Sequence, residues 1–224
     1  MAIRGIIFDM DGTITAPYLE FTKIRDQANI RDRDLLDYLR EVTGAEYARI
    51  HAILMKFEED GVANAKLNRG ARTLLNYLAR HKIPTALLTR NSRKSVAGVC
   101  RKLKLKFDVT VTREDGPHKP SPAPIRQVAK RWKLKRSELL VVGDYKWDVL
   151  CARNAGVRCA VLVNGSTPDW AKDADVIITR LTDVIRLVEG EAPSEPRREQ
   201  RGSGRDGARP SKGSRRGPGA WWVW

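Results

Sequence analysis

Two carboxylates stand two positions apart, just after an apolar run near the start of the chain. Isoleucine, isoleucine and phenylalanine occupy positions 6–8, and Asp9, Asp11, Gly12 and Thr13 follow. Side chains alternate along a strand, so Asp9 and Asp11 would face the same side just past its end, where Gly12 would let the chain turn sharply. Carboxylates this close repel each other unless a cation or a shared proton intervenes. The spacing therefore indicates a metal site or an acid–base pair, although a solvated turn after a strand would use the same residues.

Other chemically useful side chains follow apolar runs further along the chain. Thr89 and Asn91 come after one run, Asp144 ends another with Asp148 four residues later, and Lys119 stands between prolines ahead of a helical pattern. Each residue alone would also suit a helix cap or a solvated surface position. Parallel sheets bind ligands at the carboxyl ends of their strands, so these groups are expected at one edge. Together they are the parts needed to hold Mg²⁺ and a phosphoryl group.

The elements that must position these residues alternate between strands and helices. Apolar runs predict strands at 2–8, 83–89, 107–112, 139–143 and 157–163. Helical periodicity is found at 70–81, 92–103, 121–132 and 147–155. This alternation predicts an α/β fold with a parallel sheet and right-handed crossovers.

One region interrupts that alternation directly after the first strand. Residues 18–66 contain two charged, amphipathic stretches, at 32–42 and 45–59, and no convincing strand. They predict a small helical lobe placed over the site. The core is then expected to comprise residues 1–17 and 67–189.

The motifs together resemble those of the haloacid dehalogenase (HAD) superfamily of phosphohydrolases. The resemblance rests on the segment from Asp9 to Thr13, on Thr89, on Lys119, and on Gly143-Asp144 with Asp148, in that order along the chain. It implies a Rossmann-like (HAD-type) parallel sheet with helices on both faces. The insertion looks like a small C1-type helical cap after the first strand, as in phosphoglycolate-phosphatase-like and β-phosphoglucomutase-like members.

By this resemblance, Asp9 is the nucleophile that accepts the phosphoryl group as an aspartyl phosphate. Asp11 is the general acid for the leaving oxygen and then the base that activates water. Mg²⁺ is bound by Asp9, the main-chain carbonyl of Asp11 and Asp144, with Asp148 as a further ligand. Hard oxygen donors suit Mg²⁺ better than zinc.

The remaining motif residues are implied to bind the phosphate. Thr89 and Lys119 would bind its non-bridging oxygens, Asn91 would assist, and Gly12 and Thr13 would supply backbone donors. The resemblance thus implies a Mg²⁺-dependent phosphatase for a small anionic phosphoester, phosphoglycolate-like or a sugar phosphate. A phosphosugar mutase would use the same motifs. Asp11 favours phosphoryl transfer over dehalogenation, because a halide leaves without protonation.

The chain is strongly basic, with a formal net charge of +15 at pH 7. Eight Lys and Arg and four Asp and Glu in residues 190–224 account for +4, which leaves +11 on residues 1–189. The segment 190–224 is rich in Gly, Arg, Ser and Pro and is predicted to be a disordered tail. A non-catalytic protein that binds RNA or another partner through this tail is the alternative to an enzyme.

Cysteine usage and hydropathy indicate the compartment. The cysteines are Cys100, Cys151 and Cys159, without a CxxC pair, which favours reduced thiols in the cytoplasm. No apolar run approaches the roughly 18 residues of a membrane span, so we expect no membrane insertion. The sequence indicates neither a particular substrate nor an oligomeric state.

Overall fold

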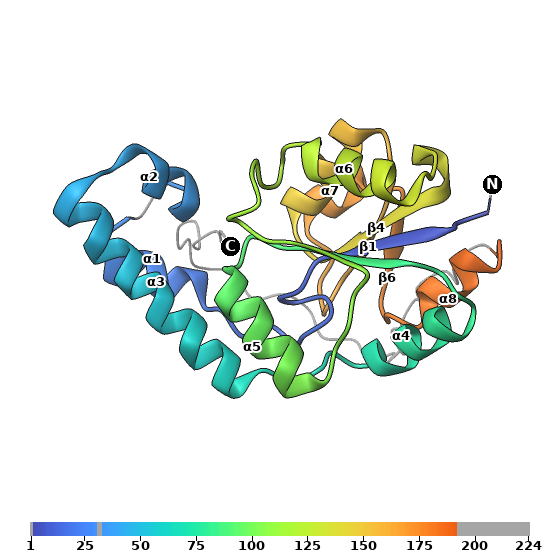
Figure 1. Cartoon of the computed structure of the whole chain (residues 1–224), viewed down its shortest axis with the longest axis horizontal. Coiled ribbons are helices and arrows are strands. Elements are labelled where there is room, and N and C mark those ends of the chain that lie inside the picture. The colour runs from blue at the N-terminus through green and yellow to red at the C-terminus, as the bar shows by residue number, and fades with distance from the viewer. Residues whose placement is uncertain (1, 31–32, 192–224) are drawn as a thin grey trace, which may run out of the picture.

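Six parallel strands form one sheet in the computed structural model, which describes residues 2–30 and 33–191 (Figure 1). The strands are β1 (Gly5–Phe8), β2 (Thr85–Leu88), β3 (Val109–Val111), β4 (Leu139–Gly143), β5 (Arg158–Leu162) and β6 (Val176–Ile178). Their order across the sheet is β3-β2-β1-β4-β5-β6. The central strands β1, β2 and β4 are buried throughout, which explains their continuous apolar sequences. The predicted α/β fold with a parallel sheet is confirmed.

Helices cover both faces of the sheet. One face carries α4 (Ala71–Arg80), α5 (Arg93–Leu103) and α8 (Asp183–Val188), and the other carries α6 (Ala123–Trp132) and α7 (Lys146–Ala155). Strand β1 contributes side chains to the hydrophobic core on both faces, since Ile6 and Phe8 pack on the first face and Ile7 on the second. Short 3-10 turns occur at Arg136–Glu138 and Asp169–Asp173. No helix within the described residues is long and apolar enough to cross a bilayer.

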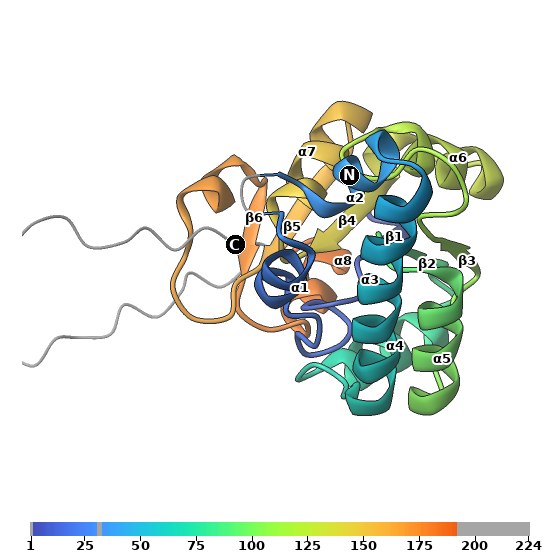
Figure 2. The same cartoon turned by 90° about the vertical axis from the view of Figure 1, so that its left-hand side faces the viewer.

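The insertion after β1 forms three helices, α1 (Phe21–Ala28), α2 (Leu35–Glu41) and α3 (Gly44–Asn64). The sequence pattern predicted only two, so α1 was missed, and α3 extends five residues past its predicted end. Helix α1 gave a weak signal because its buried residues are only Ile24 and Ala28. The three helices share a hydrophobic cluster of their own, and Figures 1 and 2 show them grouped beside the sheet.

Two further elements, β6 and α8, had no sequence prediction. A three-residue strand and a six-residue helix are too short to show a clear periodicity. The boundaries of core and insertion stay a prediction. The predicted disordered tail, 190–224, lies outside the described residues beyond Glu191.

Helix α3 packs lengthwise against α5 and so joins the insertion to the core. A Cβ atom on Gly98 of α5 would lie 2.8 Å from Cγ1 of Val62 on α3. Further along the same interface, Lys94 of α5 pairs with Glu59 of α3 at 2.6 Å. The close approach of the two helices therefore depends on the missing side chain at position 98.

We expect Gly98→Ala to destabilise the fold and Val62→Ala to suppress that loss. Overpacking costs about 1–3 kcal/mol, against a gain of up to about 1 kcal/mol in helix propensity. Shortening Val62 removes the clash, so alanine at position 98 becomes neutral or stabilising in that background. Denaturant unfolding of the wild type, both single variants and the double variant gives the coupling energy.

Ala97→Gly, at an exposed position of the same helix, is the control. Its cost of about 1 kcal/mol should be the same in both backgrounds. A loss from Gly98→Ala that persists unchanged beside Val62→Ala would contradict the predicted clash.

Candidate active site

Three carboxylates meet where β1 and β4 end. Asp9 follows β1, Asp144 follows β4, and Asp148 lies in the first turn of α7. Strands β1 and β4 are hydrogen-bonded neighbours, and the Asp9 N–H donates to the Val142 carbonyl at 2.9 Å. One oxygen from each of Asp9, Asp144 and Asp148 lies within 4.8 Å of the others. The sheet order thus brings together acids that lie far apart in the sequence.

Lys119 lies buried among these acids. Its ammonium donates to Asp9 Oδ1 and to Asp148 Oδ1, the latter at 2.7 Å. Only 4% of the residue is exposed. Lys119 comes from the connection between β3 and α6, which therefore reaches back to the end of β1.

Glycines allow the acids to approach the backbone. A Cβ atom on Gly12 would lie 2.0 Å from Asp144 Oδ2, and Gly12 also has a positive φ of 88°. A Cβ on Gly143 would lie 2.2 Å from Asp148 Cγ. Thr13 completes this part of the site, because its hydroxyl donates to Asp144 Oδ1 at 2.7 Å.

Asp11 is held by the first residues of the insertion. Its two carboxylate oxygens accept hydrogen bonds from the backbone N–H groups of Tyr18 at 2.8 Å and Leu19 at 3.1 Å. Its carboxylate is not part of the group formed by Asp9, Asp144 and Asp148. Asp11 is therefore positioned by the path of the chain into the helical insertion.

Thr89 and Asn91 lie at the end of β2, which neighbours β1. Both are buried. The Asn91 backbone N–H donates to the Thr89 hydroxyl at 3.2 Å, and the Asn91 side-chain amide donates to the Tyr18 hydroxyl at 2.8 Å. Tyr18 therefore contacts Asp11 through its backbone and Asn91 through its side chain. Sequence analysis missed Tyr18, because no periodic pattern or motif marks its position.

Two ion pairs also join the insertion to the carboxyl edge of the sheet, where the candidate active site lies. Arg90, next to Thr89, makes two hydrogen bonds to the carboxylate of Asp34, at the start of α2. Glu58 of α3 is 1% exposed and pairs with Arg113. Its carboxylate also accepts from the Ser92 backbone N–H at 3.2 Å. These pairs join distant parts of the chain, so no local signal could have predicted them.

Burial dominates the electrostatics of the site. It raises the pKa of Asp9 to about 6, against the opposing effect of Lys119, and the pKa of Asp11 to about 7. Burial also raises the pKa of Asp144, and the nearby Asp9 and Asp148 add to that shift. Burial alone would lower the pKa of Lys119, but Asp148 and Asp9 outweigh it and raise the value. The site therefore carries more negative charge than Lys119 alone can offset.

The three grouped acids fit a divalent cation. They offer hard oxygen donors, as Mg²⁺ prefers. Burial, with a smaller effect of neighbouring carboxylates, raises the pKa of Asp9 and Asp144, so their charged forms are unfavourable here unless a cation lies nearby. The residues predicted to bind metal or phosphate thus lie along the carboxyl ends of β1, β2 and β4. The Asn91 amide, predicted to assist at the phosphate, points toward Tyr18 in this structure. The Asp11 carboxylate, predicted as the acid and base, faces the insertion.

Comparison with known proteins identifies the family. The family model for haloacid dehalogenase-like hydrolases matches residues 16–162. This range covers more than half of the chain and includes Thr89, Lys119, Asp144 and Asp148, and it begins just after the Asp9 motif. The chain belongs to the haloacid dehalogenase-like hydrolase family.

Individual relatives agree with this assignment. A haloacid dehalogenase-like hydrolase domain-containing protein of Arabidopsis thaliana is 26% identical over 77% of this chain and 80% of its own length. A phosphoglycolate phosphatase of Photorhabdus laumondii is 24% identical over 83% of this chain and 92% of its own length. The crystal structure of a hydrolase from Pseudomonas syringae has the same fold, with a TM-score of 0.69, 21% identity, and coverage of 84% of this chain and all of the other.

We expect Asp144→Asn to stabilise the metal-free protein at neutral pH. Burial and the neighbouring Asp9 and Asp148 raise the pKa of Asp144 above its usual 3.8 in the folded state. The wild-type fold therefore loses stability as the pH rises from about 4 through that raised pKa, because the folded state binds the extra proton. Asparagine cannot ionise, and it keeps an oxygen for the Thr13 hydroxyl. Urea unfolding with EDTA should show a larger gain at about pH 7.5 than at about pH 4.5.

Asp60→Asn, at an exposed position of α3, is the matched control and should change stability little at either pH. If Asp144 is a Mg²⁺ ligand as predicted, saturating Mg²⁺ should stabilise the wild type more than Asp144→Asn. An equal effect of Asp144→Asn at both pH values would show that charge repulsion is not its cause.

Proposed function

We propose that this chain is a Mg²⁺-dependent phosphatase that hydrolyses a small phosphate monoester through an aspartyl phosphate on Asp9. The observation that carries the proposal is the ammonium of Lys119 shared between Asp9 and Asp148, beside Asp144, at the carboxyl ends of adjacent strands. Family membership supports hydrolysis. A carboxylate nucleophile needs nearby cations to approach an anionic phosphate, and this arrangement provides one in Lys119.

In this proposal Asp9 attacks phosphorus and releases the alcohol, and water then attacks the aspartyl phosphate to release inorganic phosphate. Lys119 and the hydroxyl of Thr89 bind the non-bridging oxygens, assisted by backbone N–H groups around Gly12 and Thr13 and by Asn91. The Asn91 side-chain amide binds the phosphate after it breaks its hydrogen bond to the Tyr18 hydroxyl. The proposed Mg²⁺ ligands are Asp9, Asp144, Asp148 and the main-chain carbonyl of Asp11. Bound Mg²⁺ would neutralise charge on the phosphoryl group and on the carboxylates.

Asp11 is the proposed acid for the leaving oxygen and base for the attacking water. Burial raises its pKa to about 7, which allows it both to give and to take a proton near neutral pH. Its contacts with Tyr18 and Leu19 place this proton at the junction between core and insertion. The 18–66 insertion is the proposed cap that selects the leaving group.

The proposed substrates are phosphoglycolate-like compounds or sugar phosphates. Relatives named phosphoglycolate phosphatase and pyrophosphatase PpaX guide the choice of test compounds. A cytoplasmic location belongs to the same proposal. It is supported by free thiols at all three cysteines, two of them buried.

We expect Asp9→Asn to reduce Mg²⁺-dependent phosphate release by about 1,000-fold or more, because the nucleophile is lost. The measurement is phosphate release across phosphoglycolate, sugar phosphates, pyrophosphate and p-nitrophenyl phosphate. EDTA should abolish wild-type activity. Asp26→Asn, an exposed carboxylate of α1, is the control and should retain full activity. Activity that survives Asp9→Asn would refute the role of Asp9, and transfer of phosphate to a sugar phosphate in place of water would indicate a mutase.

We expect the effect of Asp11→Asn to depend on the leaving group. For an alkyl phosphate the loss in kcat should be about 100- to 10,000-fold, because the alkoxide needs a proton. For p-nitrophenyl phosphate the formation of the aspartyl phosphate should be nearly unaffected, because the nitrophenolate leaves unprotonated. Burst-phase release of nitrophenol measures that step separately from hydrolysis. An equal loss of the first step for both substrates would exclude Asp11 as the general acid.

A further inference from the structure

The positive charge of the chain is concentrated in one segment of the core. Residues 66–136 contain 20 Lys and Arg against three Asp and Glu, a net charge of +17 that exceeds the +15 of the whole chain. The rest of the chain is therefore slightly acidic, at −2. The segment comprises α4, β2, α5, β3 and α6, so the charge belongs to the half of the sheet that ends at β3.

The topology places many of these cations at the amino edge of the sheet, opposite the candidate active site. A helix that returns between parallel strands ends where the next strand begins. Helices α4, α5 and α6 thus end beside the starts of β2, β3 and β4. The exposed cations at these junctions include Lys82, Arg101, Lys106, Lys130, Arg131 and Lys133. We call these six residues the amino-edge cations. Within the described residues, none of the six forms an ion pair with a carboxylate.

Helix stabilisation accounts for only part of this surface. Arg101 of α5 and Lys130 and Arg131 of α6 lie in last turns, where a cation interacts favourably with the helix dipole. Lys82 and Lys106 lie beyond the ends of α4 and α5.

Few acidic residues lie at this edge, and Glu138, directly before β4, is paired with Arg4 at 2.9 Å. Two of the three acids in the segment, Glu114 and Asp115, follow β3 at the other edge. The third, Asp108, accepts a hydrogen bond from the Thr85 N–H at 2.8 Å.

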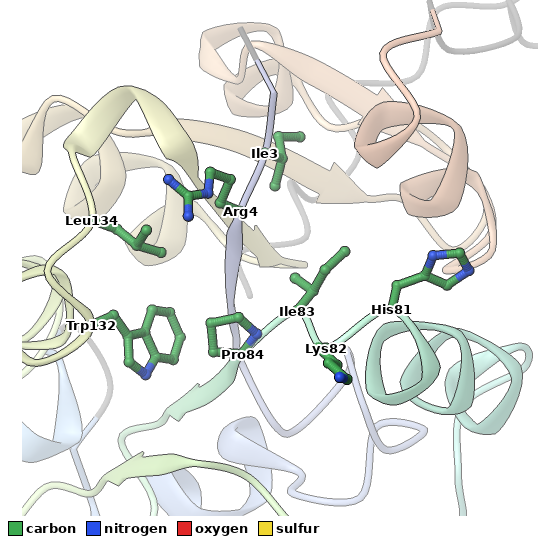
Figure 3. A pocket seen from close by; sticks show the side chains of 8 residues that line it. All are labelled: Ile3, Arg4, His81, Lys82, Ile83, Pro84, Trp132 and Leu134. Atoms are coloured by element: carbon green, nitrogen blue, oxygen red, sulfur yellow. The ribbon is translucent and has the colours of Figure 1, made fainter.

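A hollow of about 390 Å³ opens at the same edge, next to the starts of β1 and β2. Arg4, Lys82, Pro84 and Trp132 are among its lining residues, and Figure 3 shows the ring of Trp132 beside Pro84. Trp132 ends α6 and is partly exposed. The hollow therefore offers part of an aromatic ring next to Lys82 and to Arg4, which is paired with Glu138.

We propose that this amino edge binds single-stranded nucleic acid, with the backbone phosphates on the amino-edge cations and a base against Trp132. Exposed cations without carboxylate partners along one edge of the sheet suit an extended polyanion, and an aromatic ring at the same edge adds base stacking. Strand β1 separates this edge from Asp9, so nucleic acid and a phosphoester occupy different sites. The contact lies on the folded core and does not require the 190–224 tail.

The test is fluorescence anisotropy of the full chain with labelled 12-nucleotide oligouridylate and oligothymidylate. The edge variant combines Arg101→Gln, Lys106→Gln, Lys130→Gln and Arg131→Gln. The control variant combines Lys23→Gln, Lys56→Gln, Lys94→Gln and Lys172→Gln, which removes the same charge from the insertion, the start of α5 and the connection between β5 and β6. We expect the edge variant to bind about tenfold more weakly or worse at low salt, and the control variant to bind within about twofold of wild type.

The salt dependence and Trp132 provide independent readouts. Loss of up to four phosphate contacts should make the slope of log K against log salt shallower by up to about 3 in the edge variant. Trp132→Leu should weaken binding about fivefold or more without changing the salt slope, and Trp132→Phe should retain much of the wild-type affinity. Thermal melting checks that each variant is folded.

Three results would overturn the proposal. One is an equal loss of affinity in the edge and control variants. Another is full binding by the edge variant, which would place the contact elsewhere, such as the tail. The third is equal affinity for polyglutamate or phosphatidylserine vesicles, which would indicate attraction to any anionic partner. Phosphate release by the edge variant, measured in parallel, tests the proposed phosphatase separately, because that variant changes no residue of the candidate active site or of the insertion.

Discussion

Mutual repulsion among buried carboxylates is the constraint around which this structure is organised. Asp9, Asp144 and Asp148 converge at the ends of two adjacent strands, where little solvent screens their charges. Lys119 offsets part of this repulsion by bonding to two of them. The arrangement also requires glycine at positions 12 and 143, since a side chain at either would collide with an acid. Packing like charges together lowers the stability of the fold, and such arrangements are typical of functional sites.

Two ion pairs that differ in burial hold the helical insertion to the carboxyl edge of the sheet. Glu58 and Arg113, on the α3 side, are 1% and 12% exposed, so breaking their pair would leave a charge buried. Asp34 and Arg90, on the α2 side, are 24% and 16% exposed, so water and salt screen their pair more effectively. We infer that α3 stays fixed on α5 while α2 separates more easily from the edge. An insertion of this kind could admit substrate without disrupting the α3–α5 contact.

The two edges of the sheet differ in their charged groups. Buried acids gather at the carboxyl ends of β1 and β4, where Lys119 offsets part of their charge. At the amino ends of β2, β3 and β4, the described residues include exposed cations that pair with no carboxylate. Parallel topology produces this separation, because every strand start lies on one edge and every strand end on the other. The same topology keeps the cations from neutralising the acids, so each edge can serve a different ligand.

Local residue patterns were enough to predict the chemical groups and the order of the main elements. Acids and hydroxyls directly after continuous apolar runs identified the strand ends, because burial of a parallel strand leaves a clear local pattern. The short elements β6 and α8 and the weakly apolar α1 left no such pattern. Which groups touch became visible in the three-dimensional fold: Lys119 reaches Asp9 across 110 positions, Tyr18 bonds to Asn91, and Arg90 pairs with Asp34. Those contacts depend on the order of strands in the sheet and on where the insertion packs, and local residue spacing specifies neither.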